Sequence, residues 1–185
     1  MDFNFKYVII GGGSAGSVIA NRLSENPNHS VCLIEAGPRD SLPQIKMPLA
    51  ASSLFKNKKY GWCDESVPQS KLLNRTINSP RGKTLGGSSS INGMVYIRGQ
   101  QKDYNAWLDG KFGWDYHSLL PYFISLENNQ DLADQYHGNF GPLWVETFKG
   151  SLPASNLFMQ ACANYGLPHN QDFNGENQEG YGFYQ

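Results

Sequence analysis

The sequence has few cysteines, a low proportion of charged residues and no long hydrophobic run. Three cysteines in 185 residues are too few and too scattered for a disulfide framework or a zinc site. Charged residues make up 17% of the chain and the formal net charge is −1, which argues against a nucleic-acid partner. No apolar run approaches the roughly 20 residues of a transmembrane helix. These absences favour a globular protein in a reducing compartment, with no metal site.

What is present begins with a short α/β pattern in the first forty residues. Residues 7–10 are β-branched and aromatic, which predicts a buried parallel strand. Residues 17–23 have apolar positions that fit a helix, and residues 31–34 predict a second strand. A glycine-rich turn with the spacing G-x-G-x-x-G joins the first strand to the helix. The pattern predicts a Rossmann-like dinucleotide-binding unit.

Each residue of this turn has a physical role in that interpretation. Gly11 permits the tight turn, Gly13 lets the backbone approach a pyrophosphate, and Gly16 lets helix and strand pack closely. Glu35 lies 19 residues beyond Gly16 (35 − 16), where a carboxylate can accept hydrogen bonds from a ribose diol. The turn alone leaves the choice between NAD and FAD open, because both cofactors use it.

A second glycine-rich segment, residues 80–99, decides that choice. Its glycines and serines supply a flexible backbone that can wrap an anionic or heteroaromatic ligand. A solvated linker fits poorly, because the segment also carries the apolar residues Ile91, Met94 and Ile97. Residues 82–105 resemble the first signature of the glucose–methanol–choline (GMC) oxidoreductase family, whose cofactor is FAD. The resemblance disfavours an NAD-dependent enzyme.

The resemblance extends over essentially the whole chain. Within the family it is strongest to choline dehydrogenases and to alkane-pathway alcohol dehydrogenases. It implies an α/β fold with a Rossmann-like FAD-binding domain that is incomplete in this chain. The further blocks that carry the resemblance are 35–40, 47–49, 113–116, 119–123, 137–138, 141–143, 172–175 and 180–182.

The resemblance also implies which residues contact FAD. One group would hold the pyrophosphate and the adenosine ribose, and a second would lie beside the flavin. Some relatives attach FAD covalently through a histidine where this sequence has Ile91, so we expect non-covalent FAD. The expected cofactor-binding residues are Gly11, Gly13, Ser14, Ala15, Gly16, Glu35, Ala36, Thr84, Leu85, Gly87, Ser88, Asn92, Gly93, Met94 and Val95.

By resemblance, the function is oxidation of an alcohol, choline or an aliphatic primary alcohol, to an aldehyde by hydride transfer to flavin. A quinone-type electron acceptor follows from the same likeness. The few cysteines and the lack of a visible secretory signal favour a cytoplasmic location, with peripheral attachment to the inner membrane as an option. The family's catalytic histidine lies near the C-terminus of a longer chain, so we expect no catalytic residue here and no activity from this chain alone. The alternative is a non-catalytic nucleotide-binding module. None of the four histidines fits the catalytic motif: they are His29, His117, His137 and His169.

We expect two regions in the chain. Residues 1–102 would form the FAD-binding N-terminal domain, with the strand–helix–strand unit and the glycine-rich flavin loop. Residues 103–185 would be a more helical continuation that begins a cap or substrate domain. There, Trp107 and Trp114 could line a substrate surface, although packing in a core is the simpler interpretation.

Overall fold

The computed structural model describes residues 4–150 and 152–185 and divides the chain into two compact units, Met1–Met94 and Val95–Gln185. The division falls within the second glycine-rich segment, before the boundary at residues 102 and 103 that the sequence suggested. The first unit contains β1 (Tyr7–Ile10), α1 (Ser14–Ser24), β2 (Val31–Ile34), β3 (Asp64–Glu65) and β4 (Asn78–Ser79), with 3-10 turns at Pro43–Lys46, Pro48–Leu54, Ser70–Leu72 and Gly87–Ser90.

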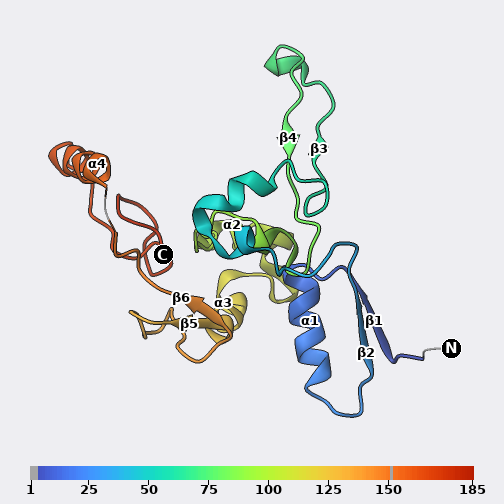
Figure 1. The fold of residues 1–185 in the computed structure, drawn as a ribbon. Helices are drawn as coiled ribbons and strands as arrows, with labels where there is room; N and C mark the ends of the chain where they lie inside the picture. Colours follow the sequence, from blue (N-terminus) through green and yellow to red (C-terminus); the bar gives the residue numbers. More distant parts are fainter. Residues whose placement is uncertain (1–3, 151) are drawn as a thin grey trace. The chain divides into compact units, whose positions relative to one another are not determined.

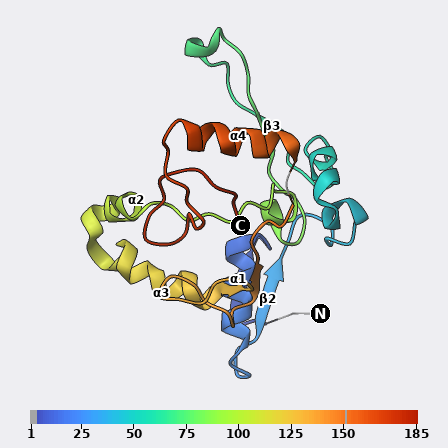
Figure 2. The ribbon, with the colours of Figure 1, turned by 90° about the vertical axis from the view of Figure 1, so that its left-hand side faces the viewer.

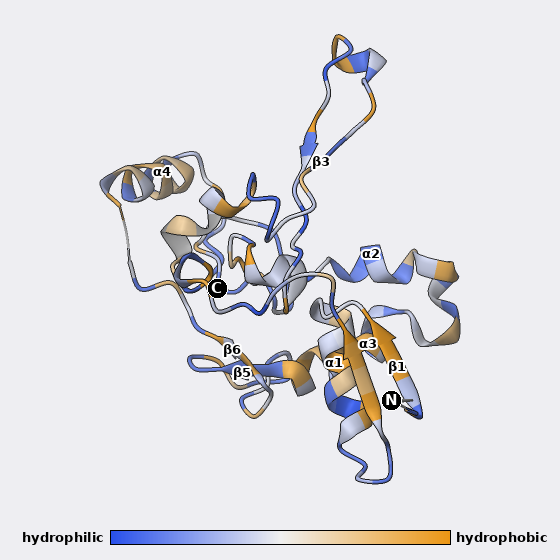
Figure 3. Cartoon of the chain, turned by 45° about the vertical axis from the view of Figure 1, so that its right-hand side comes forward, coloured by the Kyte–Doolittle hydropathy of each residue, from blue (hydrophilic) through white to orange (hydrophobic). Residues whose placement is uncertain are grey.

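The strand–helix–strand unit forms in the predicted order, but the prediction that residues 7–10 are buried is wrong, because Val8 is 54% exposed. β1 and β2 pair in parallel, with Tyr7 opposite Val31 and Ile10 opposite Ile34. Parallel strands need a crossover connection, and α1 provides it by packing against β2 (Figures 1 and 2). Both strands are strongly hydrophobic (Figure 3). Even so, Ile10 is 85% exposed, so the described residues leave part of this two-stranded sheet uncovered.

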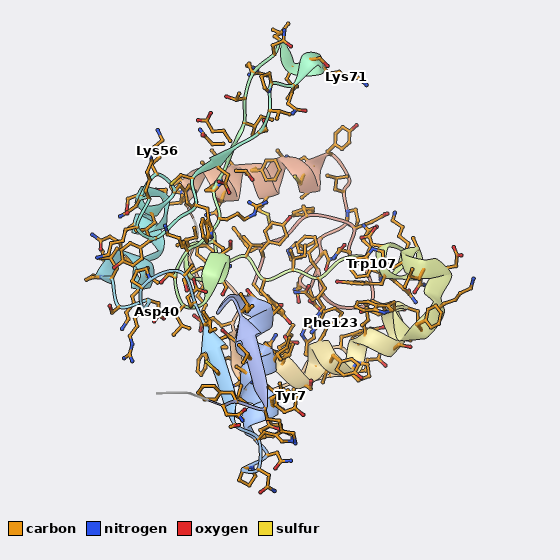
Figure 4. All side chains as sticks on the ribbon, turned by 90° about the vertical axis from the view of Figure 1, so that its right-hand side faces the viewer. Tyr7, Asp40, Lys56, Lys71, Trp107 and Phe123 are labelled. Carbon is orange, nitrogen blue, oxygen red and sulfur yellow. The ribbon has the colours of Figure 1, made fainter. Side chains whose placement is uncertain are left out.

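A long hairpin arm follows the first β–α–β unit. β3 and β4 pair antiparallel, with Asp64 opposite Ser79, and the bridge between Gln69 and Arg75 extends the pairing toward the tip. Lys71 lies at the far end of the arm (Figure 4). The arm falls within the excursion between β2 and the second glycine-rich segment. The chain returns from it into that segment through Gly82, which forms a bridge with Gly61.

Most of the regular secondary structure in the second unit is helical. Four aromatic rings of this unit form a cluster, with centroids between 5.4 and 5.9 Å apart for the pairs Tyr104–Trp107, Tyr104–Phe123 and Trp107–Trp114. The two tryptophans therefore pack against aromatic neighbours, but with 50% and 46% of their surface exposed they do not lie in the core that the sequence suggested. The elements are α2 (Gln101–Asn105), α3 (Tyr116–Leu126), β5 (Glu127–Asn129), β6 (Leu143–Val145) and α4 (Pro153–Asn164), with an irregular turn at Trp107–Gly113.

A buried charge cluster lies at the centre of the second unit. The Glu127 carboxylate is fully buried, and it accepts hydrogen bonds from Arg98 Nη2 and, at 2.8 Å, from His137 Nδ1. The other ring nitrogen of His137, Nε2, lies 2.9 Å from Asp172 Oδ2. Asn174 Oδ1 accepts the backbone N–H of Arg98 at 2.7 Å. Two cations and two anions from four separate segments thus pair in the interior.

The cluster shifts the pKa values of its members. Burial opposes protonation of His137, but hydrogen bonds to Asp172 and Glu127 outweigh it and raise the pKa from 6.5 to about 9. Burial also opposes ionisation of Glu127 and Asp172, yet hydrogen bonds from His137 outweigh that effect and lower the pKa of both carboxyls. At neutral pH His137 is therefore a cation, and both of its ring nitrogens donate.

The raised pKa of His137 predicts a loss of stability at alkaline pH. Because its pKa is higher in the folded chain than its ordinary value, protonation stabilises the fold. That contribution is complete below about pH 6.5 and disappears as the pH rises through about 9. Urea unfolding measured in steps of about one pH unit from about pH 6 to 10 should show the free energy of unfolding falling between about pH 6.5 and 9 and levelling off above that range. In His137→Gln this decline should disappear, and an unchanged decline in that variant would contradict the assignment.

Candidate functional site

The glycine turn between β1 and α1 depends on two of its glycines. Gly11 has φ +96°, in the left-handed region that glycine adopts without strain. Gly16 is buried in the first turns of α1, and a Cβ atom there would overlap the carbonyl oxygen of Gly11. The backbone of the turn is therefore packed directly against the helix. Even the methyl group of alanine would therefore be too large at position 16.

The N-terminus of α1 is open to an anion. Its N-cap is Gly13, which makes no side-chain capping bond, and the first turn has no acidic residue. The first N–H groups of a helix have no partner within the helix, and the helix dipole adds a partial positive charge. A phosphate or pyrophosphate is the group that such an end binds in the strand–helix units of dinucleotide-binding proteins.

The second glycine-rich segment lies against this turn. Gly86 donates its N–H to the carbonyl of Gly12 at 2.7 Å, and a Cβ on Gly87 would be only 2.8 Å from the Cα of Gly13. Gly87 also has φ +57°. The two turns, about seventy residues apart in the sequence (86 − 12 = 74), are thus in backbone contact. This close approach explains why both segments are rich in glycine.

The chain after β2 is the third segment of the site. The carbonyl of Pro38 accepts the hydroxyl of Thr84 at 2.8 Å and the N–H of Leu85 at 3.1 Å. Glu35, at the end of β2, accepts the N–H of Gly12 on Oε2 at 2.7 Å and the N–H of Gly37 on Oε1 at 2.9 Å. Hydrogen bonds therefore join all three segments.

These segments enclose a cleft of about 930 Å³. Such a volume is in the range of small-molecule sites, which span roughly 300–1,000 Å³. Nine of the residues expected from the sequence line the cleft. They are Gly11, Gly13, Ser14, Ala15, Gly16, Glu35, Ala36, Gly87 and Ser88.

The other expected site residues are not among those that line the cleft. Thr84 is fully buried and donates to Pro38, so its hydroxyl serves packing between segments. The side chain of Leu85 packs against Gly12: if Gly12 carried a Cβ atom, that atom would be 3.1 Å from Leu85 Cδ1. Asn92 turns its side chain back to accept the N–H of Met94 at 2.9 Å, and Gly93 lies between them. Val95 begins the second unit, so its place beside a flavin remains a prediction.

The cleft also has lining residues that the sequence did not single out as cofactor contacts. Two of these residues, Ile10 and Ile34, end the paired strands β1 and β2. The others lie at the base of the hairpin arm or at the start of the second glycine-rich segment. Arg81 is basic and could pair with a phosphate. The position of Ile10 and Ile34 at the carboxyl ends of parallel strands was available from the sequence, because ligands bind at that edge of such sheets. The full additional set is Ile10, Ile34, Trp62, Asp64, Arg81 and Gly82.

The observed geometry fits a dinucleotide cofactor. Gly11 and Gly13 leave open the space that a side chain would fill, so a ligand can approach the backbone of the turn. The N-terminus of α1 attracts a pyrophosphate, and Glu35 lies at the end of β2, where a ribose binds. The contact between the two glycine-rich segments extends the site beyond an isolated β–α–β unit. Among residues 4–150 and 152–185 there is no group of three His, Cys, Asp or Glu that could hold a metal ion.

Comparisons with known proteins identify the family. The family model described as GMC oxidoreductase matches residues 5–185. An alcohol dehydrogenase [acceptor] of Pseudomonas putida is 49% identical over 98% of the chain and 33% of its own length. The mitochondrial choline dehydrogenase of Mus musculus is 44% identical over 97% of the chain and 31% of its own length. The structure of pyridoxine 4-oxidase from Mesorbium loti has a TM-score of 0.90 and 37% identity, covering 96% of this chain and 35% of that one.

Two further facts follow from these comparisons. The predicted α/β fold of a GMC FAD-binding domain is confirmed by the family match and by the TM-score of 0.90, and a second structural neighbour is described as an FAD-dependent oxidoreductase from Chaetomium thermophilum. The chain spans about a third of the length of the curated relatives that it matches.

None of the helices in the described parts of the chain has the length and apolar character needed to cross a membrane.

Proposed function

Because the chain belongs to the GMC oxidoreductase family, we propose that its cleft binds FAD and that the complete protein oxidises an alcohol to an aldehyde. The observation that carries this proposal is the direct contact between the two glycine-rich segments, Gly12 with Gly86 and Gly13 with Gly87. A dinucleotide site for NAD needs only the first of them. The second adds the backbone surface that the family resemblance associates with the flavin.

The roles of this chain's residues in that reaction are binding and orientation. The N-terminus of α1, beginning at Ser14, would hold the pyrophosphate, and Arg81 would add a positive charge at the cleft. Glu35 would accept the ribose hydroxyls. When bound, FAD supplies the hydride acceptor for the alcohol carbon. The residue that removes the hydroxyl proton is proposed to lie outside this chain, consistent with its span of about a third of the relatives.

The substrate proposal is choline or an aliphatic primary alcohol, with a quinone-type acceptor. The names of the two relatives, an alcohol dehydrogenase [acceptor] and a choline dehydrogenase, support these two substrate classes. A cytoplasmic location, free or at the inner face of the membrane, is proposed with it. The test is anaerobic: the full-length protein should show a flavin absorption spectrum that bleaches on addition of choline or of an aliphatic alcohol. A flavin that neither substrate class reduces would contradict the proposed reaction.

We expect the FAD to be non-covalent. Ile91, in the position where some relatives have the histidine that attaches FAD, is buried with 3% of its surface exposed and offers no nucleophile. Acid precipitation of the full-length protein should therefore release about one flavin per polypeptide into the supernatant. Flavin that stays with the precipitated protein would show a covalent bond, and its site would then have to be another residue.

A second candidate function is a nucleotide-binding module without catalysis. It is favoured by the location of the whole cleft within Met1–Met94. Titration of this chain with FAD separates the two, because a module should bind FAD stably in isolation. A catalytic subunit that needs the remaining sequence should bind FAD only as the full-length protein.

A further inference from the structure

Glu35 makes contacts that the proposed ribose contact does not explain. Its two carboxylate oxygens are used by different backbone segments: Oε2 accepts the N–H of Gly12 at 2.7 Å, and Oε1 accepts the N–H of Gly37 at 2.9 Å. Hydrogen bonds to an ionised acceptor are roughly twice as strong as those between neutral groups.

Gly12 is the central residue of this arrangement. Its N–H is bound by Glu35, and its carbonyl accepts the N–H of Gly86 at 2.7 Å and the hydroxyl of Ser17 at 3.1 Å. Gly12 is buried, and a Cβ on it would be 3.2 Å from Glu35 Oε2 and 3.1 Å from Leu85 Cδ1. The first glycine turn is therefore fixed to the end of β2 on one side and to the second glycine-rich segment on the other.

Gly37 completes the connection. A Cβ on Gly37 would overlap the carbonyl of Lys83, so the backbone after β2 lies directly against the second segment. Next to it, the carbonyl of Pro38 accepts hydrogen bonds from Thr84 and Leu85. By binding Gly12 and Gly37 together, the Glu35 carboxylate joins the same three segments that enclose the cleft.

We propose that Glu35 is a positioning residue, which holds the glycine turn and the turn after β2 in the cofactor-binding arrangement before FAD arrives. The inference rests on the proposed FAD site. A carboxylate has about four lone-pair positions, so two backbone bonds leave acceptor capacity for a ribose diol. Glu35 can therefore both order the empty site and bind the cofactor. Ordering in advance lowers the entropy lost on binding.

The first test uses the full-length protein after its flavin has been removed. Gln at position 35 keeps the shape, but its amide nitrogen cannot accept a hydrogen bond, so at least one of the two backbone N–H groups loses its partner. In Glu35→Gln, amide hydrogen exchange at Gly12, at Gly37 or at both should accelerate by about tenfold or more. The exposed Glu65 gives the matched control, and Glu65→Gln should leave both rates unchanged. Unchanged rates in Glu35→Gln would overturn the proposal.

The second test separates positioning from ribose binding by ligand chemistry. ADP and 2′,3′-dideoxy-ADP differ only in the ribose diol, and each can be measured as a competitor of FAD. If Glu35 only binds the diol, Glu35→Gln should weaken ADP and leave the dideoxy compound unaffected. A positioning role predicts that the variant weakens the dideoxy compound as well, by about fivefold or more.

The remaining outcomes are also informative. If Glu35→Gln does not fold, exchange in the wild-type apoprotein decides: Gly12 and Gly37 should be protected, and exchange at the rate of unprotected amides would overturn the proposal. If the wild-type protein binds no FAD, the proposed function fails. The exchange measurement in the apoprotein still reports whether Glu35 braces the turn, so the two failures are distinguishable.

Discussion

Replacing Gly16 with alanine should abolish stable FAD binding. The added Cβ would overlap the carbonyl oxygen of Gly11 and lie 3.4 Å from Ile9 Cγ2. Because the atom that it meets belongs to the backbone, no side-chain rotation relieves the overlap, and α1 must move away from β1. Overpacking of this kind costs typically 1–3 kcal/mol. The movement also displaces the helix end from the glycine turn, so the FAD affinity should fall by about a hundredfold or more.

The measurement is fluorescence titration of the full-length apoprotein with FAD, together with its thermal unfolding. Gly61 provides the control, because it is also buried in the first unit, but a Cβ there would be 3.4 Å or more from its neighbours. Gly61→Ala should bind FAD as the wild type does. Wild-type affinity in Gly16→Ala would show that the close contact of helix and strand is not required for the site.

Replacing Glu127 with glutamine should be the most destabilising of the conservative changes in the second unit. Glu127 is fully buried between Arg98 and His137, so the substitution leaves Arg98 without a carboxylate partner and His137 with only that of Asp172. Removing one partner of a buried ion pair costs about 3–5 kcal/mol, because the remaining charge is neither hydrated nor paired. A loss of this size is a large fraction of the stability of an ordinary domain.

Urea unfolding followed by tryptophan fluorescence measures this loss, since Trp107, Trp114 and Trp144 all lie in the second unit. Glu179→Gln is the matched control: its side chain is exposed, and the free energy of unfolding should change by no more than about 0.5 kcal/mol. Equal effects of the two substitutions would contradict a structural role for the cluster. An additional loss of FAD in Glu127→Gln would show that the second unit is coupled to the cofactor site.

The parts of the fold that the sequence predicts are those encoded locally. β1, α1 and β2 follow from a β-branched run, a helical spacing and a second apolar run within a single stretch of chain. The roles of Gly11 and Gly16 follow from the same stretch, because a turn and a close helix contact need glycine at set offsets. Hydrophobic periodicity and glycine spacing are sufficient for such a unit.

The parts that the sequence did not predict depend on distant contacts. No local pattern shows that the hydroxyl of Thr84 reaches the carbonyl of Pro38 in another segment, while its expected place beside the flavin stays a prediction. The charge cluster is a clearer case: Arg98, Glu127, His137 and Asp172 belong to four separate blocks of the chain. Each is an ordinary polar residue in its own block. Only the tertiary fold brings them within hydrogen-bond distance.

The most direct test of the FAD assignment is the identity and amount of the nucleotide that copurifies with the full-length protein. Extraction by acid followed by mass spectrometry should give FAD at about one molecule per polypeptide, because one cleft is formed by the two glycine-rich segments. In Gly16→Ala the FAD should be absent, and in Gly61→Ala it should remain. Copurified NAD, or wild-type protein that takes up no flavin when FAD is added, would contradict an FAD-binding role for this chain.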